Sequence, residues 1–218
     1  MTIKVTLKDG KGSNRELCVD KEGSALVTET KIPPKELGVT LRPFALYLTD
    51  DGTTTGSKDM RVNGSTNYVD FYIQASNQGD RYIQTLAFTI ADAGAQLNEF
   101  GNLVALTNGC QLFYEDASLG DVTLASELKT NFDFVQLCNF EPTFGTGAQA
   151  FLAQNVIGTS EAYIPLLDIT DVFGLPYGLR LPKDSLKRIV LRVNDDITTI
   201  DRFDVRAFGF DRIDNEDN

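Results

Sequence analysis

The chain has 218 residues, of which 42% are hydrophobic, and this suits one domain of ordinary size or one domain with an arm. Its formal net charge of −11 and isoelectric point near 4.5 give an acidic surface that repels nucleic acid phosphates and anionic membranes. Histidine is absent, which excludes histidine-dependent catalytic triads and removes the commonest zinc ligand. We therefore expect no direct nucleic acid partner and no membrane partner.

Residues 1–40 differ in pattern from the rest of the chain. MTIKVTL and ELCVD resemble short strands, and the opening residues lack the apolar central region of a signal peptide. The link that follows contains Pro33 and Pro34, which prevent a helix and favour extended geometry. We predict an N-terminal arm or edge-strand extension over 1–40. The alternative is that these residues form the first strands of the main sheet.

From residue 43 onward, apolar and polar residues alternate in short runs, which is typical of strands with one buried face. In PFALYLT the side chains of Phe44, Leu46 and Leu48 fall on one face, and DRYIQTLAFTIA alternates in the same way. The later strand-like runs are NLVALT, CQLFYED, DFVQLCNF, AYIPLLDI, KRIVLRV and DRFDVRAFGF. Glycine, asparagine, aspartate and proline separate the runs and indicate turns.

The run NYVDFYIQA has apolar side chains on both of its faces. Alternation places Val69, Phe71 and Ile73 on one face, and Tyr68 and Tyr72 on the other. Such a strand is either covered on both sides within its own fold or covered on one side by a neighbouring subunit.

Helical patterns are short and few. Residues 92–101 and 124–130 are the candidates for one or two helical turns. Many short strands with glycine-rich turns, and no alternating long helices, predict an all-β protein. We predict an antiparallel β-sandwich, jelly-roll-like, over 41–213, followed by an acidic tail at 214–218 that is frayed.

The stretch TDDGTTTGSKDM, residues 49–60, crowds acids among threonines and glycines. With Asp51 at the first position of an EF-hand calcium loop, Gly56 and Asp59 fall where such a loop needs glycine and an acid. Val62 then stands where the bidentate glutamate is required. The pattern favours a shaped polar loop between two strands over a calcium site. An interaction loop is the remaining interpretation.

Other residues with chemical potential do not form a motif. Asp195 and Asp196 are adjacent acids, which favour a solvated turn, whereas glycoside hydrolysis needs two carboxylates across a cleft. Cys18, Cys110 and Cys138 form no CxxC pair and are expected to be buried thiols of an intracellular protein. There is no phosphate-binding or dinucleotide-binding loop, so we expect no cofactor and no enzymatic activity.

Five segments follow one another over residues 42–213: RPFALYLTDDGTTTGSKDMRVNGS, VDFYIQA, DRYIQTLAFTIADAGAQLNEFGNLVALTNGCQLFYED, LKTNFDFVQL and GLRLPKDSLKRIVLRVNDDITTIDRFDVRAFGF. In this order they resemble a family of virion structural proteins of tailed bacteriophages. The segments are structural and not catalytic. The resemblance implies a β-rich protein that coats or decorates the head, or that joins neck or tail parts.

The resemblance leads us to expect a capsid decoration or cement protein in the virion, assembled in the bacterial host cytoplasm, that bridges and stabilises head capsomers. It implies the major capsid protein or neighbouring virion proteins as partners, and a homo-oligomer, with a trimer favoured. The alternatives are a neck, tail or fibre-attachment component and a carbohydrate-binding module, although the absence of tryptophan weakens the last. The expected subunit-contact residues are Leu26, Val27, Ile32, Pro33, Pro34, Asp50, Asp51, Thr54, Tyr68 and Tyr72.

Overall fold

The computed structural model describes residues 3–8, 14–19, 25–27, 39–116, 120–138 and 161–214, and the side chains of residues 1–38 lie outside this description. The chain divides into two compact units, one of residues 1–40 with 214–218 and one of residues 41–213. In the first unit an antiparallel sheet has the strand order β1 (Ile3–Lys8), β2 (Asn14–Val19), β3 (Ala25–Val27). The extended link predicted around Pro33 and Pro34 lies outside the described residues.

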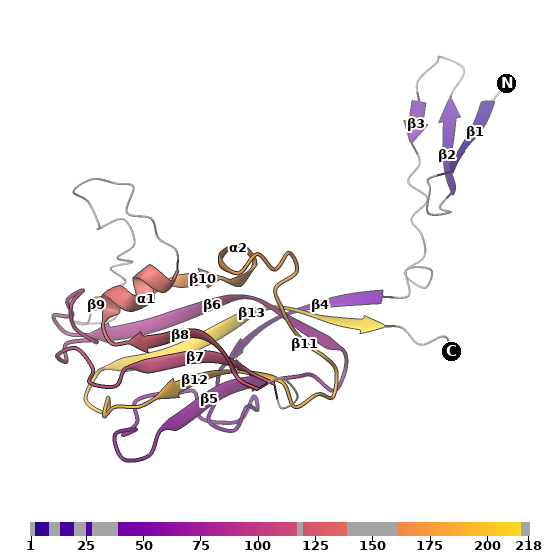
Figure 1. Cartoon of the computed structure of the whole chain (residues 1–218). Helices are drawn as coiled ribbons and strands as arrows, with labels where there is room; N and C mark the ends of the chain where they lie inside the picture. Colours follow the sequence, from indigo (N-terminus) through magenta and orange to yellow (C-terminus); the bar gives the residue numbers. More distant parts are fainter. Residues whose placement is uncertain are drawn as a thin grey trace. The chain divides into compact units, whose positions relative to one another are not determined.

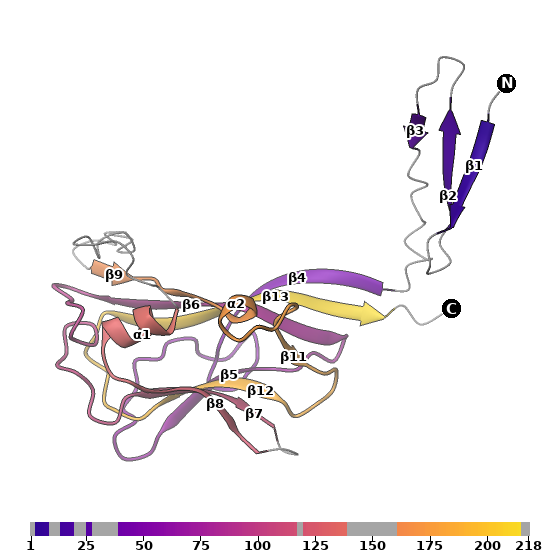
Figure 2. The ribbon, with the colours of Figure 1, turned by 45° about the horizontal axis from the view of Figure 1, so that its top comes forward.

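The second unit is a sandwich of two antiparallel sheets (Figure 1). One sheet has the order β10 (Leu166–Asp168), β6 (Asp80–Asp92), β13 (Arg202–Asp214), β4 (Val39–Tyr47), and β9 (Glu161–Tyr163) and β11 (Leu179–Leu181) also pair with β6. The other sheet has the order β5 (Val69–Gln74), β12 (Arg188–Val193), β7 (Cys110–Glu115), β8 (Val122–Leu128). Figure 2 shows the two layers one above the other.

The strand order is that of a jelly roll. From β4 to β7 the chain passes from one sheet to the other at every step, β8 pairs with β7, and β9–β11, β12 and β13 then fill the remaining places. The short strands β9, β10 and β11 pair with successive parts of β6 and together act as one edge strand. This arrangement is two Greek keys closed on each other. The predicted jelly-roll-like β-sandwich is therefore confirmed.

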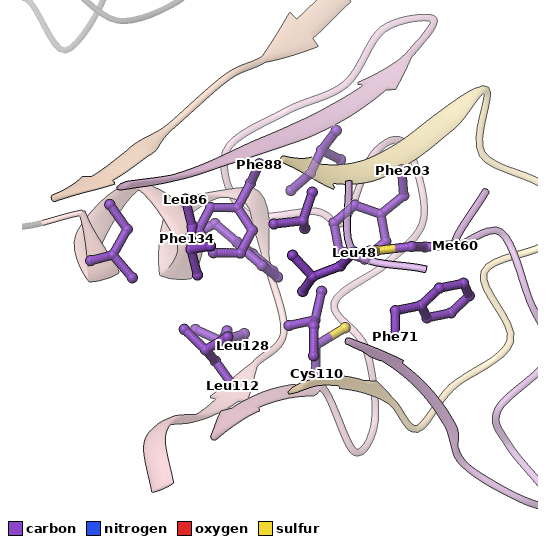
Figure 3. Packing of buried hydrophobic residues seen from close by; sticks show 14 of the residues in the cluster. Leu48, Met60, Phe71, Leu86, Phe88, Cys110, Leu112, Leu128, Phe134 and Phe203 are labelled. Atoms are coloured by element: carbon purple, nitrogen blue, oxygen red, sulfur yellow. The ribbon is translucent and has the colours of Figure 1, made fainter. Parts of the chain in front are cut away.

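The core lies between the two sheets, where the alternation in the sequence places it. Phe71 and Ile73 of β5 point inward and are buried, and Leu48, directly after β4, has no exposed surface. The ring of Phe134, which follows β8 in the chain, lies against Phe88 of β6 and Phe203 of β13, with centroids 5.2 and 5.9 Å from its own (Figure 3). Aromatic rings therefore fill the middle of the sandwich, where each one buries a large apolar surface.

The helix positions differ from the predicted ones. The run DFVQLCNF, predicted as a strand, begins inside α1 (Asn131–Leu137), and residues 133–137 of the run are helical. Thr130 caps this helix: its hydroxyl accepts the backbone N–H of Asp133, and the Asp133 carboxylate accepts the backbone N–H of Thr130. A short apolar run fits a strand or a buried helix equally well, and the capping box here marks the start of a helix. Asp168 similarly caps α2 (Ile169–Val172).

The two segments predicted to be helical are not helices. Residues 124–130 belong mostly to β8, which pairs with β7 and buries Leu128 in the core. Residues 92–101 form turns, in which Gly94 and Gly101 have φ of +74° and +60°. Glycine in this left-handed conformation is typical of turns and of the position just after a helix, so the two glycines interrupt any helix in this segment. The run NLVALT (residues 102–107), predicted as a strand, has only one β-pairing, the isolated bridge between Phe100 and Leu103.

Two cysteines are buried as expected. Cys110 and Cys138 are free thiols in the core. Burial raises the pKa of Cys138 to about 12, and burial together with the nearby Asp195 carboxylate raises the pKa of Cys110 still further. Both thiols are therefore inert at neutral pH. Cys18 is in β2, where side chains are not described. In the described ranges, no helix is long and apolar enough to cross a membrane.

Asp92, at the end of β6, is a buried carboxylate whose charge is unfavourable. Burial raises its pKa above the ordinary value of 3.8, although its Oδ1 accepts the N–H of Ala93 at 2.8 Å. A raised pKa gives stability that is fully present below pH 3.8 and is lost as the pH rises through the folded-state pKa. We therefore expect Asp92→Asn, which cannot ionise, to be more stable than wild type at neutral pH. Urea unfolding over this pH range should show the gain shrinking toward pH 3.8, and a loss at neutral pH would contradict the prediction.

Candidate functional site

The loop of residues 49–60 is held in shape by its own carboxylates. Asp51 accepts both the backbone N–H and the hydroxyl of Thr53 at 2.8 Å, and the Thr53 donors hold the Asp51 pKa below its ordinary value. Asp50 accepts the N–H of Ser57 at 2.8 Å. The loop is therefore an ordered polar structure. In the part of the chain that is described, no three His, Cys, Asp or Glu side chains come together as a potential metal site.

The same local bonding recurs in other loops of the sandwich. Asp196 accepts the N–H and hydroxyl of Thr198, and Asp168 does the same with Thr170. An aspartate that bonds a threonine two residues later makes a compact turn without any long-range contact. The stretches DDGTT (residues 50–54) and DDITT (residues 195–199) look alike because both make this local turn.

The loop packs onto β5 through Gly52. Thr49 exchanges two backbone hydrogen bonds with Tyr72, 3.2 and 2.9 Å long, and this fixes the loop at its start. Gly52 has a φ of +69°, and a Cβ there would lie only 2.2 Å from the Tyr72 ring. Glycine is therefore required both for its backbone conformation and for its close approach to the ring.

Gly52→Ala should lower stability by about 2–3 kcal/mol, because backbone strain adds to the clash with the Tyr72 ring. Gly94→Ala is the matched control, since Gly94 has a φ of +74° but nothing within 4 Å of its Cβ position. The control should cost only the backbone strain, about 1 kcal/mol. Thermal unfolding of both variants measures the difference. Equal losses of stability in the two variants would show that the Tyr72 ring moves aside without cost and would contradict the prediction.

Outward side chains of β5 and β12, together with Tyr68 directly before β5, form a layer over Phe113 of β7. We call it the aromatic face: Tyr68, Tyr72, Arg188 and Arg192. The Arg192 guanidinium lies 3.7 Å from the Tyr68 ring centroid, and that of Arg188 lies 4.3 Å from the Tyr72 centroid. Phe113 is buried below this layer, while Tyr68 remains 57% exposed. The chain thus covers most of this face itself, with cation–π contacts, and leaves one tyrosine open.

Asp70 fixes the position of Arg192 on the aromatic face. Its two oxygens accept hydrogen bonds from Arg192 Nε and Nη2 at 2.7 and 2.8 Å. A bidentate pair of this kind holds a guanidinium in one orientation. The exposed Tyr68 ring therefore rests on a rigid support, which is the arrangement that favours contact with another surface at low entropic cost.

A cleft of about 590 Å³ opens beside the loop, between β4 and the end of β5. We call it the β4–β5 cleft. It is lined by Arg42 and residues 45–47 of β4, by Thr49, Gly52, Thr53, Thr54, Gly56 and Lys58 of the loop, by residues 73–78, and by Arg81. Sequence reasoning did not find this cleft, because it depends on the separation of strands that belong to different sheets.

Asp195 and Asp196 serve loop structure. Asp195 accepts three consecutive backbone N–H groups, from Thr107, Asn108 and Gly109, and the shortest bond is 2.7 Å. This buried carboxylate therefore ties the turn before β7 to the turn after β12. Asp196 holds its own turn through Thr198. The solvated-turn interpretation therefore fits Asp196, which is exposed. It is wrong for Asp195, which is buried.

The structure brings together part of the predicted contact set. Thr54 lines the β4–β5 cleft, Asp50 and Asp51 shape the same loop, Tyr72 supports the loop, and Tyr68 lies on the aromatic face. Other members of the set are not placed. Leu26 and Val27 are in β3, where side chains are not described, and Ile32, Pro33 and Pro34 lie outside the described residues.

No family model matches the chain, and comparisons with curated proteins and with solved structures find no significant match. The fold assignment therefore rests on the strand order. The assignment to virion structural proteins, made from the sequence segments, stays a prediction.

Proposed function

We propose that this chain is a non-enzymatic structural protein of a tailed-bacteriophage virion, a decoration or cement protein that bridges and stabilises the capsomers of the head. Its partners in this proposal are the major capsid protein or neighbouring virion proteins, and it assembles as a homo-oligomer, with a trimer favoured. Each bound copy adds its binding free energy to the stability of the shell, because it binds the assembled lattice and not the separated subunits.

The observation that carries the proposal is the division of the chain into a jelly-roll sandwich, residues 41–213, and a separate strand unit that includes residues 1–40. Two units on one chain suit a bridging role, since each can bind a different neighbour and the link raises the effective concentration of the second contact. The sandwich also offers Tyr68 and Arg192, residue types that dominate the energy of protein interfaces.

A neck, tail or fibre-attachment component is the competing assignment, and copy number separates the two. A decoration protein is present in roughly hundreds of copies on a symmetric head, whereas a connector or tail ring has about a dozen or fewer. Electron microscopy of the intact particle would give both position and copy number. A density for the sandwich at the tail, and not on the head, would contradict the proposal.

Removal of residues 2–35 tests the bridging role directly. We expect the truncated protein to bind particles more weakly than the full chain, because one of its two contacts is lost. Far-ultraviolet circular dichroism and thermal unfolding would verify that the sandwich still folds. Equal binding by a folded truncated protein would contradict a role for the N-terminal unit, and decoration would then have to depend on the sandwich alone.

A further inference from the structure

The β4–β5 cleft exists because two strands pair at one point and then separate. Thr49 and Tyr72 form an isolated antiparallel bridge, but β4 and β5 belong to different sheets. If pairing continued, Tyr47 would face Gln74; instead both residues line the cleft. Two strand edges thus face each other across an open space of about 590 Å³.

The edge of β4 in this cleft has backbone groups that can accept a new strand. The N–H of Leu48 donates to the Val205 carbonyl at 2.9 Å, toward β13. Because successive peptide groups point to opposite sides of a strand, the N–H groups of Ala45 and Tyr47 point away from β13 and into the cleft. Pro43 occupies the same edge and has no N–H, so proline ends the pairing edge there.

The opposite wall of the cleft has its carbonyl groups in use. Arg81 Nη1 donates to the Gln74 carbonyl at 2.9 Å, and the Asp184 N–H donates to the Ser76 carbonyl at 3.1 Å. An inserted strand would therefore pair with β4. The available edge, residues 45–47, is about 10 Å long at roughly 3.3 Å per residue, which suits a short extended segment.

The charge of the cleft is opposite to that of the whole protein. Arg42, Lys58 and Arg81 line it, and among the described residues no aspartate or glutamate does. Arg81 and Arg42 share the Asp211 carboxylate, and the Asp50 and Asp51 carboxylates accept hydrogen bonds from the loop itself, so the charged side chains that line the cleft are cationic. Lys58 is exposed, with its ammonium 4.4 Å from the Tyr47 ring centroid. In a chain of net charge −11 this is a local site for negative charge.

We propose that the β4–β5 cleft binds an extended acidic peptide segment of a partner protein, which adds as a strand to the edge of β4. Backbone groups of Ala45 and Tyr47 provide the pairing, and acidic side chains of the segment meet Lys58 and the exposed part of Arg42. Strand addition supplies affinity through the main chain, and the cations supply selectivity through charge. The inference goes beyond the virion role and does not depend on it, because peptide binding can be tested without particles.

The test is a nuclear magnetic resonance titration of the full chain with a short synthetic peptide of alternating glutamate and valine. We expect the amide signals of Ala45 and Tyr47 to shift on binding. The same peptide with lysine in place of glutamate, and a version with N-methylated backbone amides, should not bind. No shift at these amides, or equal binding of the N-methylated peptide, would overturn the proposal.

Two variants locate the site. Lys58→Gln should weaken the acidic peptide roughly fivefold, as expected for loss of one partly exposed ion pair, while Lys129→Gln, outside the cleft, should have no effect. Ala45→Pro removes an N–H from the free edge and should abolish binding with the sandwich intact, since this edge already holds Pro43. Equal affinities of both lysine variants would overturn the charge argument.

Shifts of the Ala45 and Tyr47 signals with protein concentration alone would show that a second copy fills the cleft, and would overturn the assignment to a partner protein.

Discussion

Phe134→Ala is expected to lower the free energy of unfolding of the sandwich by about 3–5 kcal/mol. The Phe134 side chain has no exposed surface and meets three aromatic rings from other parts of the chain. Ring centroids of Phe88, Phe100 and Phe203 lie 5.2, 5.9 and 5.9 Å from its own. Truncation removes the buried apolar surface and leaves a cavity that rigid strands on both sides cannot close.

The same helix provides the control for this experiment. Phe132, two positions earlier in α1, is 42% exposed, so Phe132→Ala should change stability by about 0.5 kcal/mol or less. Urea unfolding followed by tyrosine fluorescence is the suitable measurement, because all 7 tyrosines lie within residues 41–213 and report on the sandwich. Similar losses for the two variants would mean that α1 is not anchored in the core through Phe134.

The strands that could be predicted from the sequence are those in which apolar and polar residues alternate. β4, β5 and β6 alternate with period two because one side of each faces the core. For β5 this alternation placed Phe71 and Ile73 on one face, and the structure shows that this face is the interior. The all-β class followed from many short strands and few helices, whereas the strand order of the jelly roll came from the pairing seen in the structure. These features are properties of single segments, so a single sequence contains them.

The error at α1 has a physical cause. DFVQL is a short apolar run, and such a run fits a strand or a buried helix equally well. The deciding feature was Thr130 with Asp133 three residues later, which is the signature of a capped helix start. That pattern is visible in the sequence, so the helix could have been predicted from its cap.

The β4–β5 cleft and the position of Gly52 could not be predicted in this way. Gly52 is required by the ring of Tyr72, and the cleft forms because β4 and β5 join different sheets after their bridge. Both depend on residues that come together only in the folded chain. The ion pair between Arg42 and Asp211 is the extreme case, since 169 positions separate the two residues in the sequence.

Asp211→Ala is expected to cost about 3–5 kcal/mol, because it would leave the Arg81 guanidinium buried without its counter-charge. The Asp211 side chain is 1% exposed and that of Arg81 is 12% exposed. Arg81 Nε and Nη2 donate to the two carboxylate oxygens at 2.9 and 3.2 Å, and Arg42 Nη2 donates to Oδ2 at 3.0 Å. After the substitution, Arg81 would retain the Gln74 carbonyl and the Phe44 ring, neither of which carries a negative charge.

Asp59→Ala is the matched control, because Asp59 makes the same fork with Arg61, at 2.8 and 2.7 Å, on the surface. The two side chains of that pair are 50% and 40% exposed, so water replaces the lost partner and the cost should stay below about 1 kcal/mol. Urea unfolding at low and high salt separates the two cases further. Salt screens the exposed pair and should remove most of its small effect, whereas the loss in Asp211→Ala should persist, since the buried guanidinium is out of reach of ions. Equal, salt-sensitive losses would mean that solvent reaches Arg81 and that the buried network contributes no more than a surface pair.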